Sequence, residues 1–355
     1  MSDFYEIDFL GVGTSKSGDA ITMRYKQDGK IFIHVVDGGY QSTGETLVAH
    51  IREHYDDPSF IDHVVVTHPD GDHCGGLRSV LEEFDVGALW MICPWYHTDD
   101  LIHRFSRFTN KDNLAKRLRE IYPNVAALEE IANEKRIDII APFQGAEIGP
   151  FRVLSPTYDH FLDLVEQSEK TPEGVTLKRE ETLFEIGLRA LAKLSNAVWG
   201  EELFSENNTS SENEMSVVQW MSMLGEDVVL TGDAGREALH AAADYAPMVG
   251  LNIPGVTKIQ VPHHGSRRNV DAAVLDRWLG RKMPSDGEFT TSAYVSAAKD
   301  DKHHPKNAVK RAFMHRGARV FSTENRVWIR TGRNMPERSG SITLSPELYP
   351  DTQEE

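Results

Sequence analysis

The sequence predicts an α/β (α+β) protein whose sheets are covered by helices. Short apolar runs rich in β-branched residues alternate with stretches of helical spacing along most of the 355 residues, a pattern typical of layered sheets and helices. Histidines and aspartates also gather directly after three of the predicted strands. We therefore expect the ends of these strands to carry the chemistry of the protein.

The first quarter of the chain alternates predicted strands and helices. Asp28-Gly29 separates two apolar runs and is typical of a hairpin turn. Leu47, Val48 and Ile51 recur at helical spacing. The predicted strands are 5–10, 20–25, 30–36, 61–67 and 89–93, and the predicted helices are 43–55 and 75–84.

The rest of the chain adds a charged helical stretch at 99–131, a helical acidic insertion at about 157–212, and a second series of strands and helices. Because ligand-type residues lie on both sides of the insertion, we expect residues 1–348 to form one domain, followed by a disordered tail at 349–355. The further predicted strands are 137–140, 147–154, 216–221, 227–230, 258–261, 292–296, 319–321 and 327–330, and the further predicted helices are 236–245, 271–279 and 306–315.

The composition limits the partners of the protein. A formal net charge of −17 argues against an extended surface for nucleic-acid backbones or anionic membranes, although a bound metal can still attract a small anion. Two cysteines, Cys74 and Cys93, do not make a disulfide framework, and we expect both to be reduced and buried. The sequence shows no signal-peptide pattern and no apolar run near the roughly 20 residues of a membrane span, so we expect a cytoplasmic protein.

The densest chemical signal is the segment from Thr67 to Gly76, which follows a valine-rich strand. It contains His68, Asp70, Asp72 and His73, spaced by proline and glycine. Two imidazoles and two carboxylates on one loop suit divalent metals. The alternative is a solvated polar loop, which this density of ligands disfavours.

Two later segments place ligand-type residues after strands in the same way. Asp233 follows an apolar run and a glycine, where an aspartate on its own would equally be a helix N-cap. His263 and His264 follow the strand at 258–261, where a histidine pair on its own could be structural. Three such segments make coincidence much less probable, so together they predict a binuclear metal site.

These motifs resemble the metallo-β-lactamase superfamily, and within it the hydrolase domain of ComEC-type competence proteins and their stand-alone relatives. The superfamily pattern His-x-His-x-Asp-His occurs here with Asp70 at the second histidine, as in the ComEC-like form. Gly11 departs from the usual aspartate of the opening glycine loop. The other matching segments are Phe9–Gly13, Gly18–Ile21, Asp37–Gly39, Val153–Pro156, Asn213 to Val218, Thr231–Asp233, His263–Ser266 and His304-Pro305.

The resemblance implies an αββα sandwich over most of residues 4–345 apart from the insertion, and it implies a role for each ligand. His68 and Asp70 would bind one metal, Asp72 and His73 the second, and Asp233 would bridge both. One of His263 and His264 would complete the second site, since neighbours on an extended segment point to opposite sides. The usual further histidine ligand has no clear counterpart, the nearest candidates being His97 and His160, which we expect to be surface or pocket histidines.

Two divalent ions about 3.5–4 Å apart supply a bridging hydroxide near neutral pH. We expect Asp72 and His304 to be catalytic, with His304 as proton donor to the leaving group, although His304 could instead be a helix-start residue beside Pro305. Asn213, Ser216 and Ser266 are expected to contact substrate, with a solvated turn as the alternative for Ser266. The metals are expected to be zinc or manganese, since Asp70 adds a hard oxygen donor.

The predicted function is a phosphodiesterase or nuclease for nucleotides or for small or single-stranded nucleic acid. The alternatives are a metal-dependent hydrolase of another ester class (lactone, thioester or phosphocholine ester) and a non-catalytic interaction protein on the same fold. The expected partners are a small anionic or single-stranded nucleic-acid substrate and no membrane, with the acidic insertion at 157–212 as a surface for a protein partner.

Overall fold

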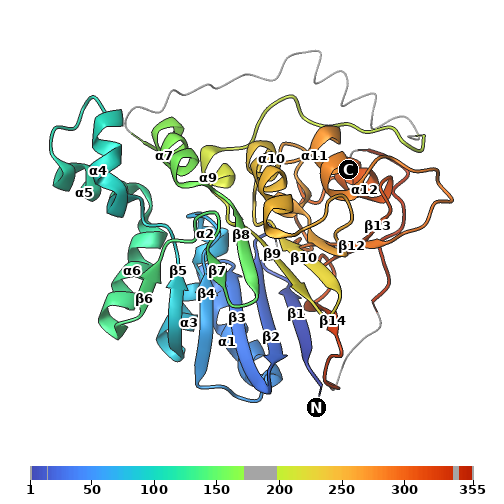
Figure 1. The fold of residues 1–355 in the computed structure, drawn as a ribbon, viewed down its shortest axis with the longest axis horizontal. Helices are drawn as coiled ribbons and strands as arrows, with labels where there is room; N and C mark the ends of the chain where they lie inside the picture. Colours follow the sequence, from blue (N-terminus) through green and yellow to red (C-terminus); the bar gives the residue numbers. More distant parts are fainter. Residues whose placement is uncertain (1, 14, 172–197, 339–343, 354–355) are drawn as a thin grey trace.

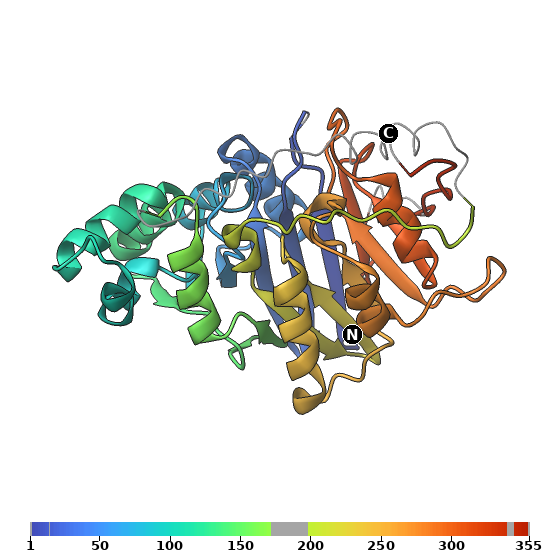
Figure 2. The same ribbon diagram turned by 90° about the horizontal axis from the view of Figure 1, so that it is seen from above.

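The computed structural model describes residues 2–13, 15–171, 198–338 and 344–353. Within these ranges two seven-stranded sheets pack face to face, and helices cover their outer faces (Figures 1 and 2). The predicted αββα sandwich is therefore confirmed.

The first sheet combines the N-terminal strands with the last strand of the chain, in the order β14-β1-β2-β3-β4-β5-β6. Its β14-to-β3 half is antiparallel and its β3-to-β6 half is parallel. The strands are β1 (Phe4–Leu10), β2 (Ala20–Gln27), β3 (Lys30–Gly38), β4 (Phe60–Val65), β5 (Asp85–Trp90), β6 (Asp138–Ile140) and β14 (Trp328–Arg333).

The second sheet has the order β13-β12-β11-β10-β9-β8-β7, with a parallel half from β10 to β13. The strand expected at 147–154 is instead the hairpin of β7 and β8, because Gly149 turns the chain with a φ of 56°. The strands are β7 (Glu147–Ile148), β8 (Phe151–Ser155), β9 (Val218–Met223), β10 (Glu226–Leu230), β11 (Lys258–Gln260), β12 (Thr291–Val295) and β13 (Ala318–Ser322).

The outer helices bury one apolar face each and create two cores outside the core between the sheets. In Figure 2 the helices of the two outer layers lie on opposite sides of the strands. The first sheet is covered by α1 (Gly44–His54), α3 (Leu77–Glu83) and α6 (Pro123–Lys135), and the second by α10 (Arg236–Tyr245), α11 (Ala272–Leu279) and α12 (Asn307–Met314).

The helix expected at 75–84 is observed as α3, which begins two residues later because a glycine pair separates it from the short helix α2. A Cβ atom on Gly76 would lie 2.0 Å from the carbonyl oxygen of Gly38, so only glycine lets the loop rest on the end of β3. The charged stretch predicted as helical at 99–131 contains several separate helices in the structure. The remaining helices are α2 (Gly71–Cys74), α4 (Thr98–Leu101), α5 (Lys111–Ile121), α7 (Tyr158–Gln167) and α9 (Ser211–Glu214).

The predicted insertion at 157–212 contains α7 and the start of α9, and its residues 172–197 lie outside the described ranges. Ser205 is tied to α10, since Arg236 Nη2 donates to its carbonyl oxygen at 2.5 Å. The organisation of residues 1–348 as one domain stays a prediction.

The last described residues lie against α12, where the sequence predicts a disordered tail. Arg311 Nη1 donates to the carbonyl oxygen of Pro350 at 2.5 Å, and Ala308 N donates to that of Gln353 at 3.0 Å. The partly buried ring of Tyr349 packs beside this helix under the Arg311 guanidinium. These contacts give residues 349–353 defined partners in the structure, and the disorder of residues 349–355 stays a prediction.

Both cysteines are free and buried, as predicted. Burial raises the pKa of both the Cys74 and the Cys93 thiol well above its ordinary value, which makes them poor nucleophiles. None of the helices in the described ranges has the length and apolar character needed to cross a membrane.

Candidate metal centre

The carboxyl ends of parallel strands from both sheets meet at one edge of the sandwich. In the first sheet, Asp37 lies near the end of β3 and the segment from His68 to His73 follows β4. In the second sheet, Asp233 follows β10 and the pair His263-His264 follows β11. Figure 1 shows α2 and α9 at this upper edge, where ligands bind in open sheets of this kind.

The loop after β4 turns back on itself so that its two histidines face the same side. The backbone oxygen of Asp70 accepts hydrogen bonds from the backbone N–H groups of His73 and Cys74, both at 3.1 Å. The Cys74 thiol donates to the same oxygen at 2.9 Å. The rings of His68 and His73 consequently lie 4.1 Å apart between centroids.

Asp37 fixes the orientation of His73. Its Oδ2 lies 2.7 Å from His73 Nδ1, and it also accepts from the Thr67 hydroxyl at 2.6 Å and, through Oδ1, from Thr67 N at 2.9 Å. A carboxylate on Nδ1 turns Nε2 inward as the free nitrogen. The sequence matched Asp37 to a family motif but assigned it no role.

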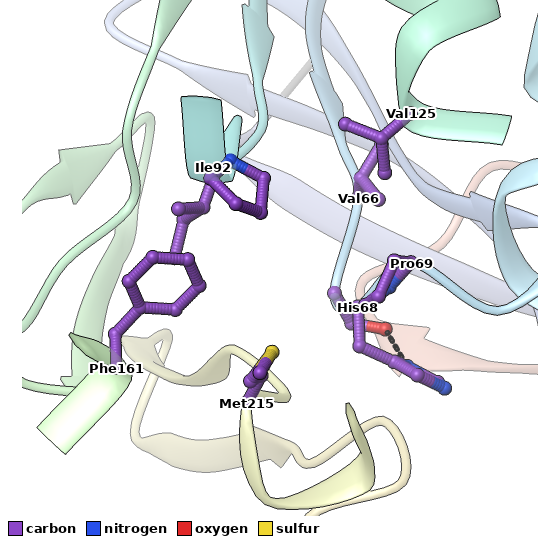
Figure 3. A pocket seen from close by; sticks show the side chains of 9 residues that line it. Val66, His68, Pro69, Ile92, Val125, Phe161 and Met215 are labelled. Atoms are coloured by element: carbon purple, nitrogen blue, oxygen red, sulfur yellow. Dashed lines mark hydrogen bonds between the residues drawn. The ribbon is translucent and has the colours of Figure 1, made fainter. Parts of the chain in front are cut away.

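His68 is held between a hydroxyl and an apolar wall. Thr67 Oγ1 lies 3.1 Å from its Nδ1, and its Nε2 lies 3.8 Å from Asp233 Oδ2 and 3.9 Å from Asp70 Oδ2. Behind it is a cavity of about 20 Å³, room for about one water molecule. Figure 3 shows the imidazole pointing away from Phe161 and Met215, which line this cavity.

Asp233 is the central carboxylate. Its Oδ1 lies 3.3 Å from His73 Nε2 and 3.8 Å from His264 Nε2, while its Oδ2 faces His68. The loop is fixed because Asp233 N donates to Ser216 Oγ at 3.1 Å and Asn269 Nδ2 donates to the Asp233 carbonyl at 2.8 Å. Asp233 therefore faces histidines from two loops, the one after β4 and the one after β11.

The histidine pair lies on a tight turn, not on the extended segment assumed from the sequence. His263 and His264 have φ values of 47° and 54°. His264 is buried with Nδ1 3.1 Å from the Ser296 carbonyl oxygen, so its Nε2 faces inward, 3.9 Å from Asp72 Oδ2. His263 is 25% exposed and its Nδ1 lies 2.6 Å from Asp233 Oδ2. The inward nitrogen at this position is thus that of His264.

Several inward atoms have no hydrogen-bond partner. A buried polar atom without a partner costs roughly 1–3 kcal/mol, yet five such atoms belong to this cluster. They are His68 Nε2, His73 Nε2, His264 Nε2, Asp233 Oδ1 and Asp19 Oδ1. A metal would satisfy them, and the described residues contain four overlapping sets with ligand atoms within 4.8 Å of one another: His68/His73/Asp233, Asp72/His73/His264, Asp19/Asp37/His73 and Asp19/Asp233/His264. The donors present therefore fit divalent metal ions.

The carboxylates change the protonation of the histidines in the metal-free protein. Burial opposes the charged form of His264, but Asp233 and Asp72 raise its pKa to about 9. Burial likewise opposes charge on His73, and Asp233 and Asp37 raise its pKa well above the ordinary value. The carboxylates therefore favour the protonated form of both histidines in the metal-free protein.

Asp19 is a buried carboxylate that sequence reasoning did not assign to the site. Gln260 Nε2 donates to its Oδ2 at 2.8 Å, and the same oxygen lies 3.8 Å from His73 Nδ1. Burial raises its pKa, which the charges of His264 and His73 oppose. Its only sequence signal was its place in the opening glycine loop.

Asp70 lies outside the four ligand sets, and the three residues expected to contact substrate differ from one another in where they lie. Asp70 belongs to none of the four sets, and its Oδ1 pairs with Lys170 Nζ at 2.7 Å. Asn213 Nδ2 lies 2.7 Å from His263 Nδ1, at the rim of the cluster. Ser216 is fully buried under the Asp233 loop, and Ser266 Oγ accepts from Arg268 N at 3.3 Å.

His304 lies at the opening of the cluster, with its ring 5.4 Å from that of His263 and 6.1 Å from that of His264. Burial and these two imidazoles lower the pKa of His304 to about 4, so it is neutral at pH 7 in the metal-free protein. The helix after it begins at Asn307 with Lys306 as N-cap, so Pro305 is not at the first helical position as the sequence suggested.

The two candidates for a further histidine ligand do not join the cluster. His97 packs among the rings of Phe143, Tyr158 and Phe161. His160 lies on α7 with a buried, unpartnered Nε2. Neither belongs to a ligand set among the described residues.

Fold and site together define an αββα protein with a candidate metal centre at the strand ends. Residues 26–162 match the family model described as the metallo-beta-lactamase superfamily, which confirms the predicted resemblance for this part of the chain. The chain is also similar to ComE operon protein 3 of Bacillus subtilis (strain 168), with 26% identity over 116 residues, 32% of this chain and 13% of that protein. The match thus spans a small part of the relative, and it supports the ComEC-like resemblance only weakly.

Solved structures are similar over most of the chain at low sequence identity. Zn²⁺-bound PqqB from Methylobacterium extorquens has a TM-score of 0.45 and 11% identity, covering 92% of this chain and 99% of that one. The metallo-beta-lactamase fold protein YhfI from Bacillus subtilis has a TM-score of 0.41 and 11% identity, covering 93% and 99%. AidC, a dizinc quorum-quenching lactonase, has a TM-score of 0.32 and 11% identity, covering 93% and 80%.

Proposed function

We propose that the chain is a binuclear metal-dependent hydrolase that acts as a phosphodiesterase or nuclease on nucleotides or on small or single-stranded nucleic acid. The observation that carries this proposal is the set of buried, unpartnered imidazole and carboxylate atoms around Asp233. Divalent ions held there would polarise a phosphoryl oxygen and make hydroxide available near neutral pH.

The chain's own residues divide into two ligand sets that share Asp233. His68 and Asp70, whose Nε2 and Oδ2 atoms lie 3.9 Å apart, would hold one ion. The inward nitrogens of His73 and His264 with Asp72 would hold the other. His263 pairs with Asp233 from outside these sets and would support it. With Asp70 where an imidazole is usual, the donor set suits manganese as well as zinc.

Residues at the opening would bind and orient the substrate. His304 Nδ1 lies 3.5 Å from Asp301 Oδ2, which leaves its Nε2 for the opening. Asn213 reaches the same side through its contact with His263. The lowered pKa of His304, about 4, leaves its ring neutral at pH 7 and disfavours it as a proton donor in the metal-free protein. Proton donation by His304 to a leaving oxygen therefore stays a prediction that kinetics must test.

The charge of the whole chain favours small substrates. A net charge of −17 repels a long nucleic-acid backbone, whereas a nucleotide meets mainly the local field of the centre. The weak likeness to ComE operon protein 3 agrees with a phosphodiester substrate class only through the resemblance inferred from the motifs.

The test is a comparison of ester classes on protein reconstituted with zinc or manganese. We expect turnover of a bis-nitrophenyl phosphodiester and of short oligonucleotides, lost with a chelator and restored by metal. His264→Ala should abolish it, whereas His103→Ala should not, because His103 is an exposed histidine with no place in the ligand sets. Turnover confined to acyl esters or lactones would reject the phosphodiesterase in favour of another ester hydrolase.

A further inference from the structure

A lysine from outside the strand-end loops reaches the candidate metal centre. Lys170 Nζ lies 2.7 Å from Asp70 Oδ1, while Asp70 Oδ2 lies 3.9 Å from His68 Nε2. One carboxylate thus has one oxygen toward the imidazole and the other toward the ammonium group. The side chains of Lys170 and Asp70 are 46% and 31% exposed, so the ammonium group is accessible from solvent.

The backbone around Lys170 is fixed. Its N–H donates to Ser168 Oγ at 3.1 Å, and Thr171 N donates to the Ser168 carbonyl at 3.0 Å. Ser168 and Thr171 are buried, and the Ser168 hydroxyl donates to Glu212 Oε1 on α9. A lysine on a packed turn loses less freedom in binding than an ordinary surface lysine.

The charge balance of the centre indicates a function for the ammonium group of Lys170. Five carboxylates contribute to the cluster: Asp19, Asp37, Asp70, Asp72 and Asp233. When all are ionised, their five negative charges exceed the four positive charges of two divalent ions, so a substrate anion gains little from the net charge of a loaded centre. A cation at the opening restores attraction, and lysine binds phosphate as a compact point charge.

We propose that Lys170 is the anion-binding residue of this site, contacting a non-bridging phosphate oxygen of the substrate beside Asp70. This inference rests on the proposed function for the nature of the anion. It does not depend on the hydrolytic step, because it concerns binding alone.

The experiment measures binding of inorganic phosphate to metal-loaded protein by calorimetry, with metal content determined in parallel. Lys170→Gln should weaken phosphate binding about tenfold with metal content unchanged, because it removes a charge-assisted contact. Lys170→Arg should retain most of the affinity. Lys116→Gln, the same change at an exposed lysine on α5, should have no effect.

Equal phosphate affinity in wild type and Lys170→Gln would overturn the proposal, as would a wild type that binds no phosphate. Loss of metal in Lys170→Gln would also overturn it, since Lys170 would then serve to hold Asp70. Lys170-dependent phosphate binding without phosphodiester turnover would reject the proposed function and leave this inference standing. Turnover with Lys170-independent binding would reject this inference alone.

Discussion

Asp37 is the residue through which the first sheet controls the inward nitrogen of His73. It accepts from His73 Nδ1 and twice from Thr67, so it ties a histidine to the end of β4. Asp37→Asn should weaken metal binding about 10–100-fold, because an amide can present its N–H groups to Nδ1 and disturb the ring. Competition with a metal indicator measures this affinity.

A matched control for Asp37 lies in the same sheet. Asp62 Oδ2 accepts a hydrogen bond from Ile33 N at 2.8 Å and belongs to no ligand set among the described residues. Asp62→Asn should leave metal affinity unchanged. Equal losses from both substitutions would mean that the effect is one of general stability.

His304 is the residue whose chemical role is most open to measurement. A positioned proton donor contributes about 10²–10⁴ in rate, so His304→Ala should lower kcat at least about tenfold with metal content unchanged. The loss should be smaller on a nitrophenyl phosphodiester, whose leaving oxygen hardly needs a proton. His303→Ala is the control, since His303 is exposed. Equal small effects from both would leave His304 as a structural residue.

The site residues that could be predicted lie close together in the sequence, whereas those that were missed lie far from their partners in the sequence. His68 to His73 lie within one short segment, so their density alone predicts a site. Asp19, directly before β2, and Asp37, on β3, reach His73 only through the fold. The choice of His264 over His263 depends on a left-handed turn that no sequence pattern predicted.

At the scale of elements, strong periodicity made the strands and helices predictable. The helix predicted at 236–245 agrees with α10, and all four strands predicted before residue 70 are recovered to within two residues at each end. Departures occur at glycines: Gly149 divides a predicted strand, and the glycine pair before Leu77 moves the start of a predicted helix by two residues. In both places a backbone requirement overrode the side-chain pattern.

The junction of α9 and α10 carries a titratable contact away from the metal ligands. Glu214 accepts from Ala238 N at 2.8 Å and from Glu237 N at 3.4 Å in the first turn of α10. Burial raises the pKa of Glu214 to about 7, although these N–H groups favour the charged form. Because the pKa of Glu214 is raised in the folded state, the stability that its protonated carboxyl group contributes is fully present below the pKa of the unfolded state. This stability is lost as the pH rises through about 7.

Glu214→Gln copies the protonated form and should therefore remove this dependence. We expect the free energy of unfolding of the variant, relative to that of the wild type, to increase by about 1–3 kcal/mol from pH 5 to pH 8. Urea unfolding at both pH values measures the difference. A difference that stays constant with pH would show that Glu214 is charged throughout and caps α10.

At the scale of the whole molecule, the candidate site joins the two sheets. His68 and His73 come from the first sheet, and Asp233 and His264 come from the second. Metal bound by all of them should stabilise the complete sandwich, by about 2.7 kcal/mol at a hundredfold excess over Kd. We expect a chelator to lower the unfolding midpoint by about 3–4 °C.

Calorimetry also tests the prediction that residues 1–348 form one domain. We expect a single transition that shifts as a whole when metal is removed. Two transitions, only one of which responds to metal, would indicate separate units and would place the ligands in one of them.

The most direct test is the metal content of fully reconstituted protein, measured by elemental analysis with zinc and with manganese. We predict two ions per chain, and lower occupancy in both Asp72→Ala and His73→Ala, because each removes a ligand of the Asp72/His73/His264 set. At most one ion in the wild type, under conditions that saturate it, would contradict the binuclear centre.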